Sequence, residues 1–237
     1  MKLNADIGEH EPPARTRALM RLIDLANIAC GGHAGDAATM ERAVRLAIEF
    51  RVSIGAHPGL PADFGRGVAE IGGKELEALV SEQVSALADI SRRRGAALYH
   101  LKLHGALYHA AERSESLAEH YVDLVRSRFA GLKIVALAGG RVISRCRELG
   151  VPAIPEAFAE RGYREDGTLI PRGQPGDLVT DPRIAAERVR TLSEDGCIAV
   201  ESGRIVPIDA QTICVHSDTP NAVRIARAAR EALGSRV

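Results

Sequence analysis

The sequence predicts an α/β fold in which helices pack around a parallel β-sheet, in a single domain that covers residues 1–237. Three observations predict it. Short apolar segments alternate with amphipathic helical segments along the whole chain, as in repeated βαβ units. The 237 residues, 46% of them apolar, are enough to bury one large core. Polar side chains recur where the apolar segments end, as at the ligand-binding edge of such sheets.

Seven short apolar runs are the predicted strands. They cover residues 2–5, 25–30, 52–56, 98–103, 134–137, 153–157 and 212–215. A further pair of runs, residues 198–200 and 204–208, is separated by Glu201, Ser202 and Gly203 and predicts a β-hairpin inserted before the last strand. A parallel sheet of this size forms either a barrel or a doubly wound sheet.

The helices carry clear boundary signals. In residues 74–94 apolar side chains recur at steps of three and four, and Gly95 supplies the stop. Pro220 is expected at a first helical position, and Gly234 ends the same helix. Residues 161–177 contain too many glycines and prolines for a helix and predict a long ordered loop, a kind of segment that is often functional.

Composition excludes several classes of function. Lys plus Arg and Asp plus Glu both number 31, so no overall field attracts nucleic acid or an anionic membrane. No apolar run reaches the roughly 20 residues of a membrane span, and the first residues lack a signal-peptide layout, so we expect a cytoplasmic protein. The cysteines show no CxxC spacing and are interpreted as small buried residues: Cys30, Cys146, Cys197 and Cys214.

Groups suited to acid–base chemistry or ligand binding lie at or just beyond six of the seven predicted strands. In chain order they are Asn4, Asp6, Asn27, His33, Asp36, His57, His100, Lys102, His104, Glu156, Arg161, His216 and Asp218. Because the carboxyl ends of parallel strands open on one face, we expect these side chains to converge there. The alternation of His100, Lys102 and His104 would point all three into the mouth of a barrel, while Leu101 and Leu103 face the helices.

Each of these residues also has a purely structural interpretation. A single histidine at a strand end more often satisfies loop amides than catalyses a reaction, and His10, His109 and His120 are interpreted in this way. Asn4 and Asn27 would then pin neighbouring loops, and Asp36 would cap the helix of residues 37–50. For the whole set, a structural interpretation would require polar residues to occur independently at six strand ends, so the pattern favours a functional site.

Six ordered motifs carry a resemblance to a known family. They read NADIGE, NIACGGHAGD, IGAHPG with FGRG, KLHGALYH, EAFAERGYREDGTLIPR and TICVHSDTPNAV. Together they resemble the LamB/YcsF family over nearly the whole chain. The resemblance implies an irregular seven-stranded parallel β/α barrel of the glycoside hydrolase/deacetylase type. The sequence differs from the family pattern in a shortened first loop, where Glu11 leads quickly into a helix, and in Ser217, where glycine is common.

Members of that family are described as the A subunit of a bacterial ATP-dependent 5-oxoprolinase. The resemblance therefore implies that 5-oxoproline is opened to L-glutamate with hydrolysis of ATP, together with partner subunits B and C. For this reaction we assign Asp6 and one of His57 or His104 to proton transfer, and Lys102 and Arg161 to phosphate or carboxylate. The orienting residues would be Glu156, His33, Asp36, His216 and Asp218, and Asn4, Asn27 and His100 complete the substrate-binding set.

Nucleotide binding has no recognisable motif in this chain. The segment GGKE at residues 72–75 lacks the spacing and the hydroxyl residue of a P-loop, so we expect a partner subunit to hold ATP, with Mg²⁺ as its usual counter-ion.

Two further functions stay open at this point. A stand-alone metal-dependent deacetylase or amidohydrolase would use Asp6, His33 and His57, with His104, as ligands of a Zn²⁺ ion. A non-catalytic subunit would bind a small anionic metabolite at the barrel mouth. Homo-oligomerisation is compatible with all three functions.

Overall fold

A closed barrel of seven parallel strands forms the centre of the computed structural model, which describes residues 1–61 and 70–234. Neighbouring strands pair in chain order, and the last strand pairs with both the sixth and the first. The barrel strands are β1 (Lys2–Ile7), β2 (Leu25–Ala29), β3 (Ser53–His57), β4 (Leu98–Leu101), β5 (Lys133–Leu137), β6 (Ala153–Phe158) and β9 (Thr212–Val215). This confirms the predicted α/β barrel and its seven strands.

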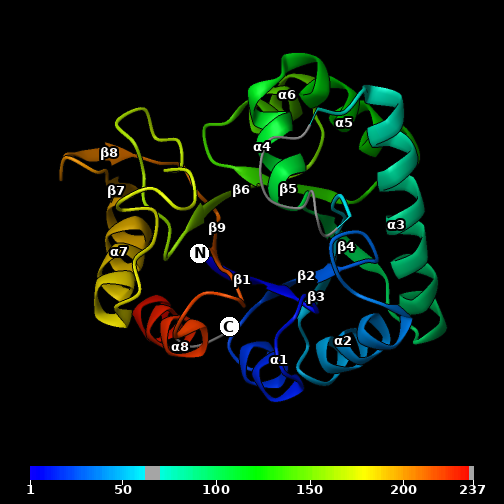
Figure 1. Cartoon of the computed structure of the whole chain (residues 1–237), viewed down its shortest axis with the longest axis horizontal. Helices are drawn as coiled ribbons and strands as arrows, with labels where there is room; N and C mark the ends of the chain where they lie inside the picture. The colour runs from blue at the N-terminus through cyan, green and yellow to red at the C-terminus, as the bar shows by residue number, and fades with distance from the viewer. Residues whose placement is uncertain (62–69, 235–237) are drawn as a thin grey trace.

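Helices surround the barrel on all sides (Figure 1). They are α1 (Pro13–Met20), α2 (Ala37–Glu49), α3 (Gly73–Arg93), α4 (Gly105–Arg113), α5 (Glu115–Arg128), α6 (Arg141–Leu149), α7 (Pro182–Asp195) and α8 (Ala222–Leu233). The predicted hairpin forms from β7 (Cys197–Ala199) and β8 (Ile205–Pro207), which pair antiparallel outside the barrel beside α7 (Figure 1).

One helix boundary differs from the prediction. We expected Pro220 at a first helical position, but α8 begins at Ala222, with Asn221 as its N-cap in the left-handed conformation at a φ of 63°. Asparagine tolerates this conformation better than most residues, so the chain turns once more before the helix starts. The FGRG segment, residues 64–67, lies outside the described residues.

The two faces of the barrel strands have different chemistry. Outward-facing side chains such as Leu3, Ile28 and Leu101 are buried in the main core beneath the helices. Inside the barrel, Leu25, Val135 and Ile154 form a separate apolar cluster towards the amino ends of their strands. The remainder of the interior is largely polar, which explains why the sequence of β1 and β4 alternates between apolar and polar residues.

A hydrogen-bonded layer of polar side chains lies above this apolar cluster. Asn4 Nδ2 donates to Thr212 Oγ1 at 2.9 Å, and Asn27 Nδ2 donates to Asn4 Oδ1 at 2.7 Å. His100 Nε2 lies 2.8 Å from Asn27 Oδ1. All four residues have no exposed surface. These bonds compensate for the loss of water around buried polar groups and give the barrel a rigid polar floor.

The cysteines agree only in part with the sequence-based expectations. Cys30, Cys146 and Cys214 are buried, as expected, whereas Cys197 is partly exposed, and all four are free thiols. Within residues 1–61 and 70–234, no helix has both the length and the apolar character needed to cross a membrane.

Gly55 provides the space that His100 occupies in the polar floor. A β-carbon at this position would lie 2.0 Å from His100 Nε2. We expect Gly55→Ala to lower the free energy of unfolding by about 1–3 kcal/mol, the usual cost of overpacking a rigid core, as measured by urea denaturation. Gly72→Ala is the control, because no described atom lies within 4 Å of a β-carbon there. Equal losses of stability in the two variants would contradict this account.

Candidate functional site at the mouth of the barrel

Most of the predicted site residues meet at the carboxyl ends of the strands. The structure brings together Asp6, His33, His57, Lys102, His104, Glu156 and His216. Each comes from a strand end or from the loop that follows it. Of the thirteen predicted residues, Asn4, Asn27 and His100 lie one layer deeper, in the polar floor, so His100 does not reach the mouth as we expected.

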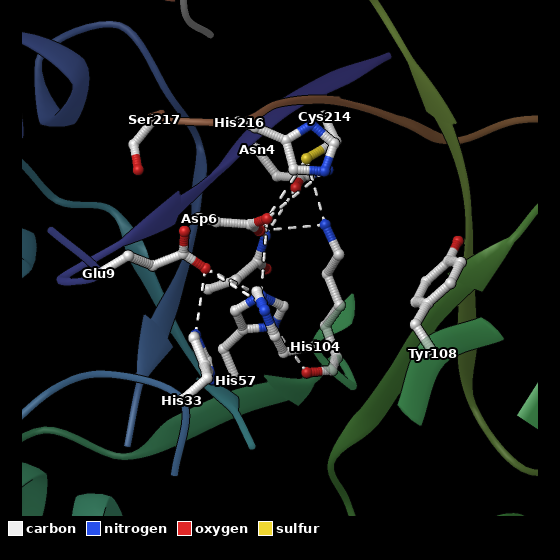
Figure 2. Close-up of polar contacts among 12 residues, drawn as sticks. Asn4, Asp6, Glu9, His33, His57, His104, Tyr108, Cys214, His216 and Ser217 are labelled. Atoms are coloured by element: carbon white, nitrogen blue, oxygen red, sulfur yellow. Dashed lines mark hydrogen bonds and ion pairs between the residues drawn. The ribbon is translucent and has the colours of Figure 1, made fainter. Parts of the chain in front are cut away.

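Asp6 is the centre of the site, because four side chains face its carboxylate (Figure 2). Its Oδ1 accepts hydrogen bonds from Asn27 Nδ2 at 2.8 Å and from Lys102 Nζ at 3.1 Å. Its Oδ2 lies 3.5 Å from His57 Nε2 and 3.8 Å from His216 Nε2. Burial alone would raise the pKa of Asp6, but the charges of Lys102 and His57 outweigh it and hold the pKa well below its usual value.

Lys102 is enclosed by acceptors. Its Nζ lies 3.1 Å from Asp6 Oδ1, from Glu156 Oε1 and from Cys214 Sγ. Burial opposes its charge, yet Asp6 is close enough to raise the pKa of Lys102 well above the ordinary value. Burial also raises the pKa of Glu156, despite the opposing effect of Lys102. The pKa of Glu156 is thus shifted upward while that of Asp6 is shifted downward, which suits Glu156 better than Asp6 to the role of proton donor.

Three histidines and one glutamate form a second part of the site. Glu9 Oε1 lies 3.1 Å from both His33 Nε2 and His104 Nδ1, and His104 Nδ1 lies 3.2 Å from His57 Nε2. His33 and His104 stack with ring centroids 3.5 Å apart. Burial lowers the pKa of His104 to about 4, whereas in His57 the neighbouring Asp6 outweighs burial and raises the pKa.

His216 is oriented by a carboxylate that has no exposed surface. Glu160 Oε1 accepts a hydrogen bond from the backbone N–H of His216 at 3.0 Å and a second one from its ring Nδ1. The ring lies nearly parallel to that of Phe158. These contacts direct Nε2 of His216 towards Asp6.

Three predicted residues have other contacts. The guanidinium of Arg161 donates to the backbone oxygens of Asp177 and Ile170, at 3.2 and 2.5 Å, and so braces the long loop that the sequence predicted. Asp36 is exposed and caps α2 by accepting from Thr39 N, the structural role weighed for it. Asp218 lies 3.9 Å from Arg172.

Four residues of the site were not predicted from the sequence, namely Glu9, Glu160, Tyr108 and Cys214. Glu9 and Glu160 each lie two residues beyond a strand, where a search for polar residues at strand ends would have found them. Tyr108 donates to Glu156 Oε2 at 3.4 Å from within α4, and Cys214 lies in a strand whose sequence is largely apolar. Neither carries a local sequence signal.

The shortened first loop and Ser217 meet beside Glu9. Glu11 Oε1 accepts from Gly8 N at 2.7 Å, and Glu11 Oε2 accepts from Glu9 N at 3.0 Å. Ser217 Oγ also contacts Glu11 Oε2, at 3.4 Å. The two departures from the family pattern therefore form one contact, and that contact fixes the backbone that carries Glu9.

His100 gives the protein a defined sensitivity to acid. Burial, and then the charge of Lys102, lower its pKa from 6.5 to about 3. The unfolded chain therefore binds the proton first, and the free energy of unfolding should fall as the pH drops from about 6.5 towards 3, by up to about 1.4 kcal/mol per pH unit.

His100→Gln replaces the imidazole N–H by an amide N–H donor that cannot titrate, so urea unfolding at about pH 7 and about pH 5 should show a smaller loss of stability than in the wild type. His120→Gln, at an exposed position, should keep the wild-type loss. An unchanged pH dependence in His100→Gln would rule out this assignment.

The Lys102–Glu156 contact can be measured by a double-mutant cycle. Lys102→Met leaves two buried carboxylates without their cation and should cost about 3–5 kcal/mol of unfolding free energy. Adding Glu156→Gln removes one of these carboxylates, so the double variant should be more stable than the sum of the single effects predicts. Additive effects in urea denaturation would show that the two groups do not interact.

Comparison with known proteins gives consistent relatives. The chain is 42% identical to the A subunit of 5-oxoprolinase from Streptomyces avermitilis, over 99% of this chain and 97% of that protein. It is 40% identical to the corresponding 5-oxoprolinase subunit from Bordetella pertussis, over 98% and 94% of the two chains. These similarities cover the strands and loops that build the barrel mouth.

Solved structures show the same fold. A lactam utilization protein from Thermus thermophilus superposes with a TM-score of 0.90 at 38% identity, covering 98% of this chain and 95% of that one. A putative cellobiose-phosphate cleavage protein from Enterococcus faecalis, at 14% identity and a TM-score of 0.53, shares the fold alone, over 98% and 92% of the two chains. The model of the LamB/YcsF family matches residues 1–236. With relatives this similar along its whole length, the chain belongs to the LamB/YcsF family.

Proposed function

We propose that this chain is the A subunit of an ATP-dependent 5-oxoprolinase, which opens the lactam of 5-oxoproline to L-glutamate while ATP is hydrolysed to ADP and phosphate. The names of the relatives support the reaction class. The observation that carries the proposal is the buried pair of Asp6 and Lys102, with His57 and Glu156 in contact range of it. The site thus combines an ionised acid, a cation and proton-carrying groups at the mouth of the barrel.

The proposed chemistry suits these groups. An unstrained lactam is a poor electrophile, so its carbonyl group must be activated before water can attack the ring carbon. Transfer of a phosphoryl group from ATP to the carbonyl oxygen would achieve this, and a base must then activate the water. The adduct would break its C–N bond, with a proton delivered to the ring nitrogen, and leave an acyl phosphate, which a second water would hydrolyse to L-glutamate and phosphate. His57 and Asp6 form the pair that would remove the proton, and Glu156, with its raised pKa, would supply one.

The cations need a different distribution from the one that the sequence suggested. Lys102 already neutralises Asp6 and contacts Glu156, so its charge acts on the substrate through these acids. Arg161 uses its donors on loop carbonyls, so it would shape the pocket wall rather than grip a phosphate. Asn4, Asn27 and His100 would hold Asp6 in place from below.

In this proposal a partner subunit binds the nucleotide. The chain contains no P-loop sequence, and the GGKE segment forms the start of α3. Subunits B and C would therefore hold ATP with Mg²⁺ and close over the barrel mouth. We expect the assembly to work in the cytoplasm, where the four free thiols would stay reduced.

A stand-alone metal-dependent hydrolase is the second candidate. The observation that favours it is the convergence of Glu9, His33, His57 and His104. Such an enzyme would cleave its amide or ester substrate without ATP, which separates the two candidates cleanly.

The first experiment measures glutamate release from 5-oxoproline, with and without ATP, by the purified chain alone and together with its two partner subunits. The proposal predicts glutamate only in the complete mixture with ATP. Release without ATP would favour the hydrolase instead. No release by folded components under any condition would overturn the proposed reaction.

Asp6→Asn tests the role of the central carboxylate in the same assay. It should lower the rate of glutamate release by roughly 10²–10⁴-fold, the usual contribution of a group in acid–base catalysis. Asp209→Asn is the matched control, because Asp209 is exposed and pairs with Arg147 on the outer surface. Comparable rates for the two variants would argue against a catalytic Asp6.

A further inference from the structure

Four side chains at the barrel mouth direct their donor atoms towards one point. They are Glu9, His33, His57 and His104, from the loops or strand ends after β1, β2, β3 and β4. One donor atom from each lies within 4.8 Å of all the others. Figure 2 shows the carboxylate of Glu9 beside the rings of the three histidines.

The spacing of these atoms matches a tetrahedral metal site. Bonds of about 2.0–2.1 Å from a zinc ion to nitrogen and oxygen place tetrahedral ligands about 3.3–3.4 Å apart. Glu9 Oε1 lies 3.1 Å from His33 Nε2, 3.1 Å from His104 Nδ1 and 3.8 Å from His57 Nε2. His104 Nδ1 lies 3.2 Å from His57 Nε2. Because a metal ion lies in the plane of each imidazole that binds it, His33 and His104 would rotate out of their stacked arrangement to bring all four donors onto one ion.

The orientation of His57 is that of a metal ligand. The backbone oxygen of Lys102 can only accept, so His57 Nδ1 donates its proton to it at 2.8 Å. In the neutral ring this leaves the lone pair on Nε2, which faces the other three donors. Histidine ligands of metals are usually fixed by such a second hydrogen bond.

His33 and His104 are in contact with each other and already face Glu9. Their rings stack at 3.5 Å, and a β-carbon on Gly59 would lie 2.4 Å from His33 Nδ1, so that glycine leaves the space for the ring. His33 Nδ1 is buried with no hydrogen-bond partner in the part of the chain that the structure describes. No hydrogen bond among the described residues therefore holds Nδ1 against rotation of the ring, while Nε2 is directed at Glu9.

The charges around the point favour a cation. The buried carboxylates of Glu9 and Asp6 both face His57, at 3.8 and 3.5 Å. Lys102 pairs with Asp6, whereas the ion-pair partners of Glu9 among the described residues are the three histidines themselves. A divalent cation would supply more positive charge at the same place.

We propose that this chain binds one Zn²⁺ ion through Glu9 Oε1, His33 Nε2, His57 Nε2 and His104 Nδ1. Three imidazoles and one carboxylate suit zinc and exclude Mg²⁺, which prefers oxygen ligands. Glu9 supplies the carboxylate in place of Asp6, which we had expected from the sequence, because Asp6 is engaged by Lys102. The inference goes beyond the proposed function and does not rest on it, since the chain should bind zinc without ATP, substrate or partners. With zinc on His57 Nε2, removal of the proton in the proposed reaction would fall to Asp6 alone.

The test uses the full chain, stripped of metal with a chelator and then titrated with Zn²⁺ and, as a spectroscopic probe, with Co²⁺. Zinc should bind with a stoichiometry of about one per chain, and cobalt should give the intense visible bands of a tetrahedral site. His33→Asn and Glu9→Gln should weaken zinc binding by more than the roughly 10–100-fold that loss of an outer-shell partner costs. His120→Asn is the matched control and should bind as the wild type does.

X-ray absorption on the zinc-loaded wild type makes the test independent of variant folding. It should show nitrogen and oxygen neighbours at about 2.0–2.1 Å with imidazole scattering. A sulfur neighbour would instead indicate Cys214 with Asp6 and His216, the other group of potential ligands among the described residues, and would overturn the assignment. Absence of zinc binding by the folded wild type, or equal binding by all variants, would overturn it too.

Discussion

The contact between Asp6 and Lys102 is the interaction on which the rest of the site depends. Both groups are almost completely buried, and each would be costly to leave unpaired in the barrel. Their contact at 3.1 Å keeps both charged, with the pKa of Asp6 lowered and that of Lys102 raised. This pair separates the apolar and amide-lined interior from the acid–base groups at the mouth.

The polar floor explains why this pair has a fixed geometry. The chain of bonds from Thr212 through Asn4 to Asn27 ends on Asp6 Oδ1, so the carboxylate cannot rotate without breaking buried hydrogen bonds. Its second oxygen is then left to face His57 and His216. A rigid floor thus presents one ionised oxygen to the part of the barrel that receives a ligand.

The carboxyl groups buried at the mouth need positive charge or hydrogen-bond donors beside them. They belong to Asp6, Glu9, Glu156 and Glu160. Lys102 serves Asp6 and Glu156, and histidines face the other two. A reaction that develops negative charge at the mouth would disturb this pairing of carboxylates with Lys102 and the histidines. A bound cation would add to the positive partners. Glu11 in the short first loop contacts Ser217 and accepts a hydrogen bond from the backbone N–H of Glu9, so this loop fixes the position of the Glu9 carboxylate at the mouth.

The sequence by itself determined the parallel α/β class, the seven strands and most residues at the mouth, while the closed barrel was implied by the family resemblance. Alternation of strands and helices is a local pattern, and parallel strands necessarily bring their carboxyl ends to one face, so Asp6, His57 and Lys102 were predictable as neighbours. Local signals also predicted residues 161–177 as an ordered loop, and they offered the helix-cap role of Asp36 that the structure shows in place of the predicted binding role.

Only the tertiary structure decided which groups share a proton or a charge. Whether His100 reaches the mouth or stays in the floor depends on barrel tilt and register, which place it against Asn27. That Glu9 pairs with His33 and His104, while Asp6 pairs with Lys102, depends on how these side chains extend across the interior. Such contacts join residues up to 208 positions apart. They depend on side-chain positions to within a few tenths of an ångström, and the periodicity of the sequence does not specify positions that finely.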